Sequence, residues 1–325
     1  MKTWAAAPHV VHSTRVISCM AADRERPAVV TGVAITPDGR TIAAATDDHS
    51  VHIWDVASDA WKARLPGHAD WVYSVGLASD GKTLISGAGD RMICLWDIEQ
   101  QTPIFHAPAC DSAIAGVCFH PNNQQVAVVG FSSRLHIVNT SSGQTSQQLI
   151  CPCVDVRTVT FSPDGKRLAV AGRNGRIRLW DVDSGSHERD IETDRRRIRA
   201  LAFSPDGRLL AAAGNSPEIR LMDVATGQVV ATLDSRPAKV RTLLFLGNER
   251  LAAGGTDNRI AIWDVYSRQV TRQLVGHTGT VSSLACDATG GVLVSGGYDT
   301  TLRIWDLDQS AAPAVAAQTP GEATR

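Results

Sequence analysis

One short motif recurs seven times along the chain at nearly constant spacing. Its seven copies are Trp54-Asp55, Trp96-Asp97, Val138-Asn139, Trp180-Asp181, Met222-Asp223, Trp263-Asp264 and Trp305-Asp306. Five of the six steps are 42 residues, and the step from 222 to 263 is 41. A fixed period of about 40 residues indicates one supersecondary unit that is repeated. Because the repeats fill most of the 325 residues, we expect one continuous domain rather than two.

Each repeat reads as four short strands joined by tight turns. In the second repeat the candidate strands are 71–78, 83–87, 92–96 and 104–107, which contain many Val, Ile, Leu and Ala residues. Pro-Asp-Gly triplets such as Pro163-Asp164-Gly165 reverse the chain, since proline presets one turn dihedral and glycine accepts a positive φ. A four-stranded sheet with two apolar faces cannot stand alone. Ringed face to face with six others, it buries both faces.

Two repeats carry a fuller pattern than the others. The second contains Gly67-His68, Asp90 and Trp96-Asp97, and the seventh contains Gly276-His277, Asp299 and Trp305-Asp306. These units resemble the WD-repeat family over residues 15–308. The resemblance implies an all-β fold, namely a seven-bladed β-propeller of four-stranded antiparallel blades around a central channel. We expect residues 1–14 to form an N-terminal arm and 309–325 a disordered C-terminal tail.

The last repeat lacks a fourth strand of its own. It ends near Leu307, and the tail that follows is rich in Ala, Pro and Thr. Residues 15–20 precede the first repeat at the right offset to supply that strand. We therefore predict that an N-terminal strand closes the ring at blade seven. The alternative is that the tail makes this strand.

Composition narrows the possible environments of the protein. The formal net charge of −1 provides no overall attraction to nucleic acid or to an anionic membrane. The seven cysteines are irregularly spaced, and Cys151-Pro152-Cys153 differs from metal and redox motifs, which have two intervening residues. We expect free thiols there. No stretch of about 18 apolar residues and no apolar leader is present, so we expect a cytoplasmic protein.

A Ser-His-Asp combination occurs twice. His68, Ser86, Asp90 and Trp96 recur at the same offsets as His277, Ser295, Asp299 and Trp305. A nucleophilic site is one interpretation. Duplication, the included Trp and the lack of a Gly-x-Ser-x-Gly motif all oppose it. The resemblance implies two structural tetrads, in which hydrogen bonds tie the opening loop to the second and third strands. We predict no catalytic residue, no metal site and no cofactor.

The resemblance also implies where partners dock, which is the face where the opening loops and second turns cluster. The fifth position after the opening His is expected to line its mouth, and it carries Thr31, Tyr73, Ala115, Arg157, Arg199, Arg241 and Ser282. The predicted partner-binding residues on this top face are Trp71, Tyr73, Arg91, Phe131, Arg157, Arg173, Arg197, Arg199, Lys239, Arg241 and Tyr298. One arc is basic and the opposite arc is aromatic, a composition typical of interface hot spots.

The leading hypothesis is a non-catalytic protein–protein interaction scaffold that holds an acidic or phosphorylated segment. We expect a monomeric propeller within a larger complex. One alternative is nucleic-acid binding through the Arg arc of blades four to six, and another is an enzyme with a site at the channel mouth. A simpler explanation of the arc is that its arginines form ordinary ion pairs with Asp155, Asp194 or Glu218.

Overall fold

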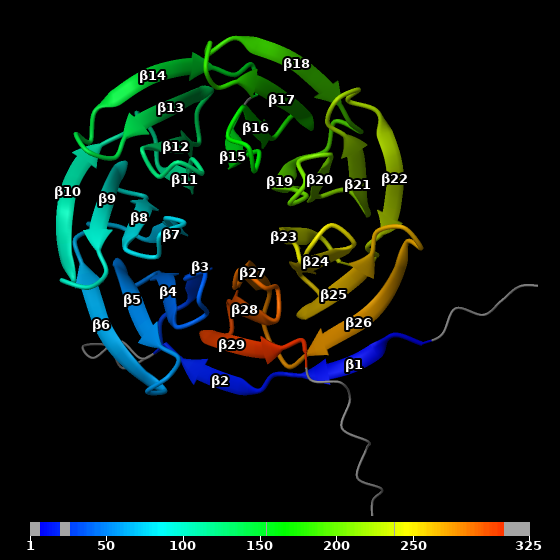
Figure 1. Cartoon of the computed structure of the whole chain (residues 1–325), viewed down its shortest axis with the longest axis horizontal. Helices are drawn as coiled ribbons and strands as arrows, with labels where there is room; N and C mark the ends of the chain where they lie inside the picture. The colour runs from blue at the N-terminus through cyan, green and yellow to red at the C-terminus, as the bar shows by residue number, and fades with distance from the viewer. Residues whose placement is uncertain (1–6, 20–26, 154, 237, 309–325) are drawn as a thin grey trace, which may run out of the picture.

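The structure is a computed structural model that describes residues 7–19, 27–153, 155–236 and 238–308. The described residues form seven sheets arranged in a ring (Figure 1), and residues of the innermost strands line a central channel. Among them there is no helix, and so none that could cross a membrane. The predicted seven-bladed propeller is confirmed. The predicted C-terminal tail, 309–325, and Met20 at the end of the predicted closing strand lie outside the described residues.

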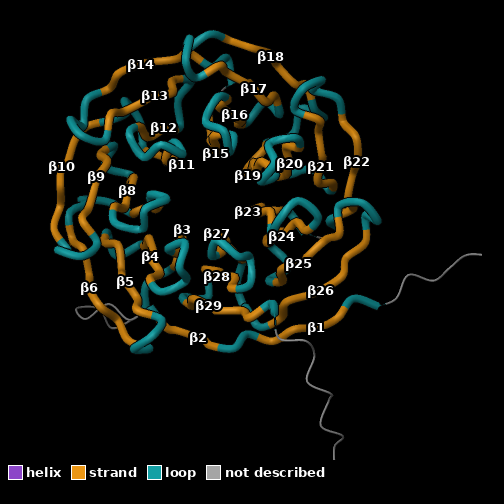
Figure 2. Tube along the Cα trace, in the orientation of Figure 1, coloured by secondary structure: helices purple, strands orange, loops and turns teal. Residues whose placement is uncertain are grey.

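Each blade is a meander whose first strand faces the channel and whose last strand lies on the rim (Figure 2). The strands of blades one to seven, in chain order, are β3 (Val30–Ile35), β4 (Thr41–Thr46), β5 (Ser50–Asp55) and β6 (Ala60–Pro66); β7 (Val72–Leu77), β8 (Thr83–Ala88), β9 (Met92–Asp97) and β10 (Thr102–Pro108); β11 (Ile114–Phe119), β12 (Gln125–Gly130), β13 (Arg134–Asn139) and β14 (Thr145–Ile150); β15 (Val156–Phe161), β16 (Arg167–Gly172), β17 (Arg176–Asp181) and β18 (His187–Glu192); β19 (Ile198–Phe203), β20 (Leu209–Gly214), β21 (Glu218–Asp223) and β22 (Val229–Asp234); β23 (Val240–Phe245), β24 (Arg250–Gly255), β25 (Arg259–Asp264) and β26 (Gln269–Val275); β27 (Val281–Cys286), β28 (Val292–Gly297) and β29 (Thr301–Asp306).

The second strand of each blade is the most buried. β4, β8, β12, β16, β20, β24 and β28 are buried at every position after the first. Their many Ala and Gly residues let neighbouring sheets approach closely near the axis. Larger apolar side chains fill the wider gaps, as where Val51 of blade one packs in one cluster with Leu84 and Trp96 of blade two. The core is therefore a series of apolar layers between blades.

Blade seven is completed by a strand from the other end of the chain. β2 (Arg15–Ser18) pairs antiparallel with β29, in a register that places Arg15 opposite Ile304 and Ser18 opposite Thr301. Ile17 is 5% exposed and packs with Leu302 and other residues of blades one and seven. The predicted closure by an N-terminal strand is confirmed.

A further strand precedes β2. β1 (His9–His12) pairs in parallel with β26 and makes blade six five-stranded. Val11 packs against the cluster that contains Leu274 and Leu307. The N-terminal segment thus runs along the rims of two successive blades (Figure 1). These residues were expected to form part of an N-terminal arm, and this strand was not predicted.

The cysteine expectation was wrong at one place. Cys151 and Cys153 form a disulfide across Pro152, with Cα atoms 5.0 Å apart. This separation lies within the usual range for a disulfide, so one intervening residue suffices.

Burial raises the pKa of the Cys19 and Cys94 thiols to about 12, and nearby Asp48 and Asp90 add to these increases.

Candidate functional site

A β-bulge interrupts the innermost strand of each blade at the same place. In blade four, Val156 pairs with Gly172 and Thr158 with Ala171, so Arg157 is left without a partner residue on β16. A bulge bends its strand and re-aims the side chain of the extra residue. The seven bulged residues are Thr31, Tyr73, Ala115, Arg157, Arg199, Arg241 and Ser282. They are the same seven residues that repeat register places at the fifth position.

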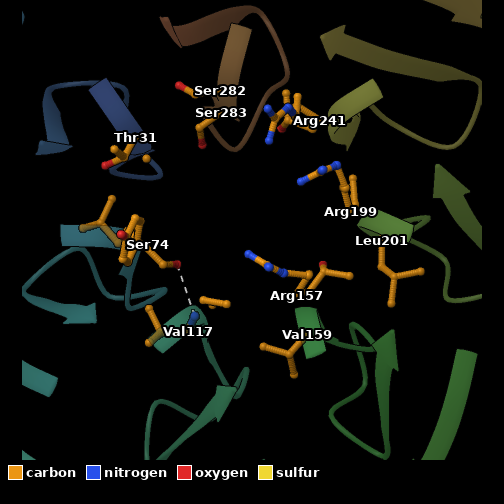
Figure 3. A pocket seen from close by; sticks show the side chains of 18 of the residues that line it. Thr31, Ser74, Val117, Arg157, Val159, Arg199, Leu201, Arg241, Ser282 and Ser283 are labelled. Carbon is orange, nitrogen blue, oxygen red and sulfur yellow. Dashed lines mark hydrogen bonds between the residues drawn. The ribbon is translucent and has the colours of Figure 1, made fainter. Parts of the chain in front are cut away.

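All seven bulged residues line one cavity at the mouth of the channel. Its volume is about 350 Å³. Figure 3 shows Arg157, Arg199 and Arg241 reaching into this space from three successive blades. Phe131 and Tyr298, from the turns after β12 and β28, complete the wall. We call this space the channel-mouth cavity.

The three arginines differ in their partners. Arg157 Nη2 donates to Asp155 Oδ2 at 3.0 Å, and Arg197 Nη2 donates to the same oxygen at 3.1 Å. Arg199 Nε donates to the neutral Asn215 Oδ1 at 3.1 Å. Within the part of the chain that the structure describes, neither Arg199 nor Arg241 forms an ion pair with a carboxylate. Of the four guanidinium groups, those of Arg157 and Arg197 therefore share one carboxylate, and the other two have none in the described structure.

Burial and the crowding of positive charge both affect the pKa of Arg199. Burial, followed by the positive charges of Arg241, Arg197 and Arg157, lowers the pKa of Arg199 to about 10. Arginine is almost never shifted so far, because its guanidinium is strongly basic. The positive charge of Arg199 is thus poorly compensated. Groups with strongly shifted pKa values gather at functional sites, although structural networks also produce them.

Aromatic rings bracket the basic arc at both ends. The guanidinium carbon of Arg157 lies 3.9 Å from the centroid of the Phe131 ring, and that of Arg241 lies 5.9 Å from the Tyr298 ring. Tyr73 lies between Phe131 and Trp71, with ring centroids 6.0 and 6.3 Å away. The Phe131 and Tyr298 rings limit the freedom of the Arg157 and Arg241 side chains, which reduces the entropy that a bound partner must remove.

The predicted top-face residues divide into two groups. Tyr73, Phe131, Arg157, Arg199, Arg241 and Tyr298 line the channel-mouth cavity. Five others do not line it, namely Trp71, Arg91, Arg173, Arg197 and Lys239. The ion-pair alternative holds for Asp155. Asp194 and Glu218 instead lie within ion-pair distance of Arg220, on the third strand of blade five.

Several lining residues were missed by the sequence analysis. Thr158 and Thr242 directly follow bulged arginines and line the cavity. Ser74 Oγ accepts a hydrogen bond from Val117 N at 3.1 Å, and Ser283 Oγ accepts one from Val33 N at the same distance (Figure 3 shows the first). Reading one register position further along each first strand would have found all four.

Both tetrads form hydrogen-bonded relays. In blade two, His68 Nδ1 lies 3.0 Å from Asp90 Oδ2 and His68 Nε2 lies 2.8 Å from Ser86 Oγ, while Trp96 Nε1 donates to Ser86 Oγ at 2.9 Å. Asp90 also accepts from the backbone N of Ala69. Ser86 is fully buried. A substrate could not reach its hydroxyl, so the geometry supports a structural role.

Blade seven repeats this geometry closely. His277 lies 2.9 Å from Asp299 and 2.7 Å from Ser295, and Trp305 Nε1 donates to Ser295 at 2.9 Å. Burial alone would raise the pKa of the Asp299 carboxyl. The hydrogen bond and charge of His277, together with donors from Thr278 and Thr301, outweigh burial and hold this pKa below its ordinary value.

One group in the described residues has ligand atoms close enough for a metal ion. Atoms of His68, Cys94 and His106 lie within 4.8 Å of one another. Both ring nitrogens of His68 are already hydrogen-bonded to Asp90 and Ser86. A metal could bind there only by breaking the relay.

Comparisons with known proteins place these features in a family. Three relatives each match one short segment: Periodic tryptophan protein 2 homolog from Neurospora crassa is 51% identical over 57 residues (17% of this chain, 6% of that protein), U3 snoRNP-associated protein-like EMB2271 from Arabidopsis thaliana is 40% identical over 57 residues (18% and 12%), and WD repeat and SOCS box-containing protein 1 from Homo sapiens is 46% identical over 57 residues (17% and 14%). The matched segments span only a small part of the length of these relatives.

Two family models match successive portions of the chain. The model described as IFT122 first beta-propeller matches residues 29–248, and the model described as WD domain, G-beta repeat matches residues 268–306. The first match covers more than half of the chain and includes the bulged strands of blades one to six. The protein therefore belongs to the WD-repeat family of β-propellers represented by these models.

Proposed function

We propose that the protein is a non-catalytic interaction scaffold whose channel mouth receives an acidic or phosphorylated segment of a protein partner. The observation that carries this proposal is the charge imbalance at the mouth, where two of four guanidinium groups share the carboxylate of Asp155 and Arg199 and Arg241 have no carboxylate partner in the described structure. Arginine recognises carboxylate and phosphate through paired hydrogen bonds. A negatively charged segment would supply the missing counter-charge.

The surroundings of the arc also favour a protein partner. Trp71 is 44% exposed and Tyr298 is 47% exposed, so apolar rings stand beside the charged groups. Exposed aromatic residues next to arginines are typical of interface hot spots. The name of the Arabidopsis relative associates that protein with a ribonucleoprotein, and by analogy we propose that this propeller acts as one monomeric subunit of a larger assembly. We also propose that this assembly is cytoplasmic.

The test is capture of a partner from native lysate by the immobilised full chain. Reversing charge at Arg157, Arg199 and Arg241 (each Arg→Glu) should abolish capture without changing the melting temperature by more than a few degrees. A matched control reverses charge at Arg40, Lys166 and Arg208, which are exposed and lie in the first turns of blades one, four and five. These turns lie at the opposite ends of the strands. Capture that survives the first triple variant would refute the proposal.

Nucleic-acid binding is the competing function, because stacked rings beside arginines also suit single strands. Nuclease treatment of the lysate distinguishes the two. Capture that disappears after nuclease, with an affinity for RNA that falls steeply with salt, would favour nucleic acid. Capture of a protein that is indifferent to nuclease supports the scaffold.

A further inference from the structure

Resting on the proposed function, we infer that the channel-mouth cavity is a phosphoryl-group site that prefers a phosphomonoester dianion to a carboxylate. Arg199 lies in the middle of the basic arc on the cavity wall, flanked by Arg157 and Arg241 on the neighbouring blades (Figure 3). The ligand is either a phosphorylated side chain of the partner or a small free phosphate ester, since both present the same terminal group.

Charge distinguishes the two kinds of anion. The only carboxylate paired with these arginines in the described structure, Asp155, is shared between Arg157 and Arg197. Arg199 and Arg241 remain uncompensated. A carboxylate brings a single negative charge, whereas a phosphomonoester brings about −1.5 to −2 at neutral pH. The dianion therefore matches the two uncompensated guanidinium groups, and a single carboxylate leaves one of them unmatched.

The free donor atoms also match a phosphoryl group. Asp155 engages Arg157 Nη2, and Asn215 engages Arg199 Nε. The two Nη groups of Arg199 and all the donors of Arg241 have no hydrogen-bond acceptor among the described residues. Three terminal oxygens can accept from several directions at once, while a carboxylate offers two oxygens in one plane.

Neutral donors lie beside the charged ones. Thr158 and Thr242 follow the bulged residues Arg157 and Arg241 and line the same cavity. Within the described ranges, neither hydroxyl forms a side-chain hydrogen bond, in contrast to Thr31, whose hydroxyl donates to Ala45 O at 3.0 Å. A volume of about 350 Å³ is within the usual range for small-ligand pockets and can hold a phosphorylated side chain or a small ester.

The experiment measures binding of defined probes to the full chain by fluorescence anisotropy. The probes are three fluorescein-labelled peptides of Gly and Ser that carry phosphothreonine, Glu or Thr at the centre. We expect the phosphothreonine peptide to bind about tenfold more tightly than the Glu peptide or better, and the Thr peptide to bind weakest. Direct calorimetric titration with glycerol 3-phosphate and with inorganic phosphate then separates the two ligand sources.

Variants locate the site. Arg199→Gln and Arg241→Gln should each weaken phosphothreonine binding about tenfold or more and remove the preference over Glu. Thr158→Val and Thr242→Val should weaken it a few-fold without changing the net charge. The matched control is Arg208→Gln, an exposed residue on the same blade as Arg199 but in the turn between β19 and β20. It should bind like the wild type.

Each outcome has a definite meaning. Equal affinity for the phosphothreonine and Glu peptides would overturn the phosphoryl preference and leave the scaffold proposal intact. Binding of neither the peptides nor glycerol 3-phosphate would also overturn it, even where the Arg→Glu triple variant still loses its partner. Tight binding of glycerol 3-phosphate alone would support the site and assign its ligand as a free ester.

Discussion

Blades two and seven differ from blades one, four and six in how they accommodate a buried tryptophan. In the first pair, the indole N–H of Trp96 or Trp305 donates to a buried serine at 2.9 Å. In the other three blades the serine position holds Ala44, Val170 or Ala253, which have no acceptor. There the Nε1 atoms of Trp54, Trp180 and Trp263 are buried without a hydrogen-bond partner.

The indole ring is therefore buried in all five blades whether or not its N–H has an acceptor. A buried donor without an acceptor costs about 1–3 kcal/mol, and an aromatic side chain can offset this cost by burying 150–250 Å². Trp54, for example, packs edge-on against Trp61 with ring centroids 4.9 Å apart. The hydrogen-bonded relay is therefore an addition to a packing arrangement that also forms without it. Single substitutions that remove or add one hydrogen-bonding group in either kind of blade can test this comparison.

The largest effect should come from removing the relay carboxylate. Asp299→Ala leaves His277 Nδ1, Thr278 N and Thr301 Oγ1 without their acceptor, so the free energy of unfolding should fall by about 3–5 kcal/mol. Asp257→Ala at the equivalent place in blade six is the matched control, because it should cost less than about 1 kcal/mol. Denaturant unfolding measures both. Equal losses would mean that the relay adds nothing.

A smaller effect should follow from making blade two resemble blade one. Ser86→Ala removes the acceptor of Trp96 Nε1 and the partner of His68 Nε2 while keeping the side-chain volume nearly constant. We expect a loss of about 1–3 kcal/mol in unfolding free energy. A change near zero would indicate that the relay serines are dispensable, and the contrast between the blades would then disappear.

Acid should weaken the relay blades through two groups. Burial lowers the pKa of His68 against the opposing effect of Asp90, so its neutral form favours folding above its ordinary pKa of about 6.5 and that contribution is lost as the pH falls. The pKa of Asp299 is also lowered, so its contribution is present above about pH 4 and is lost on further acidification. Unfolding free energies measured from about pH 7 to pH 3 should decline, and Asp299→Asn should flatten the acidic part of the curve. An unchanged slope in that variant would assign the decline to other groups.

The smallest effect should be a gain. Ala253→Ser places a hydroxyl at the position that Ser295 occupies in blade seven, where it can accept from Trp263 Nε1. We expect about 0.5–1 kcal/mol of added stability. Ala252→Ser is the control, because this buried neighbour faces the other side of the strand and should destabilise. A destabilising Ala253→Ser would show that the buried indole has adapted to an apolar neighbour.

Periodicity in the sequence predicts much of this structure because equal spacing gives every repeat the same strands and turns at the same positions. The spacing of 42 residues predicts seven blades, and it predicts that Arg157, Arg199 and Arg241 occupy equivalent places. The structure puts all three at the same bulge. The strand that closes blade seven is also predictable, since the last repeat is one strand short.

Side-chain partners and the outermost strand are harder to predict. Register does not determine which arginine pairs with Asp155, because long side chains reach several neighbours. The three indoles without acceptors follow from Ala44, Val170 and Ala253, yet recognising them needs the knowledge that no other acceptor approaches. β1 has only four residues and pairs in parallel with a strand more than 250 residues away, so no local pattern indicates it.

The N-terminal strands β1 and β2 also bear on how the protein is made. Thr14 donates to the backbone of Ile304, 290 residues further along the chain. At about 5–20 residues per second, a ribosome needs roughly 15–60 s to synthesise that interval. Until blades six and seven are made, β1 and β2 have no strands to join, while the early blades can already stack. Ring closure therefore cannot precede the synthesis of blade seven, and a nascent chain stalled before blade seven would expose both β2 and an uncovered face of blade one to chaperones.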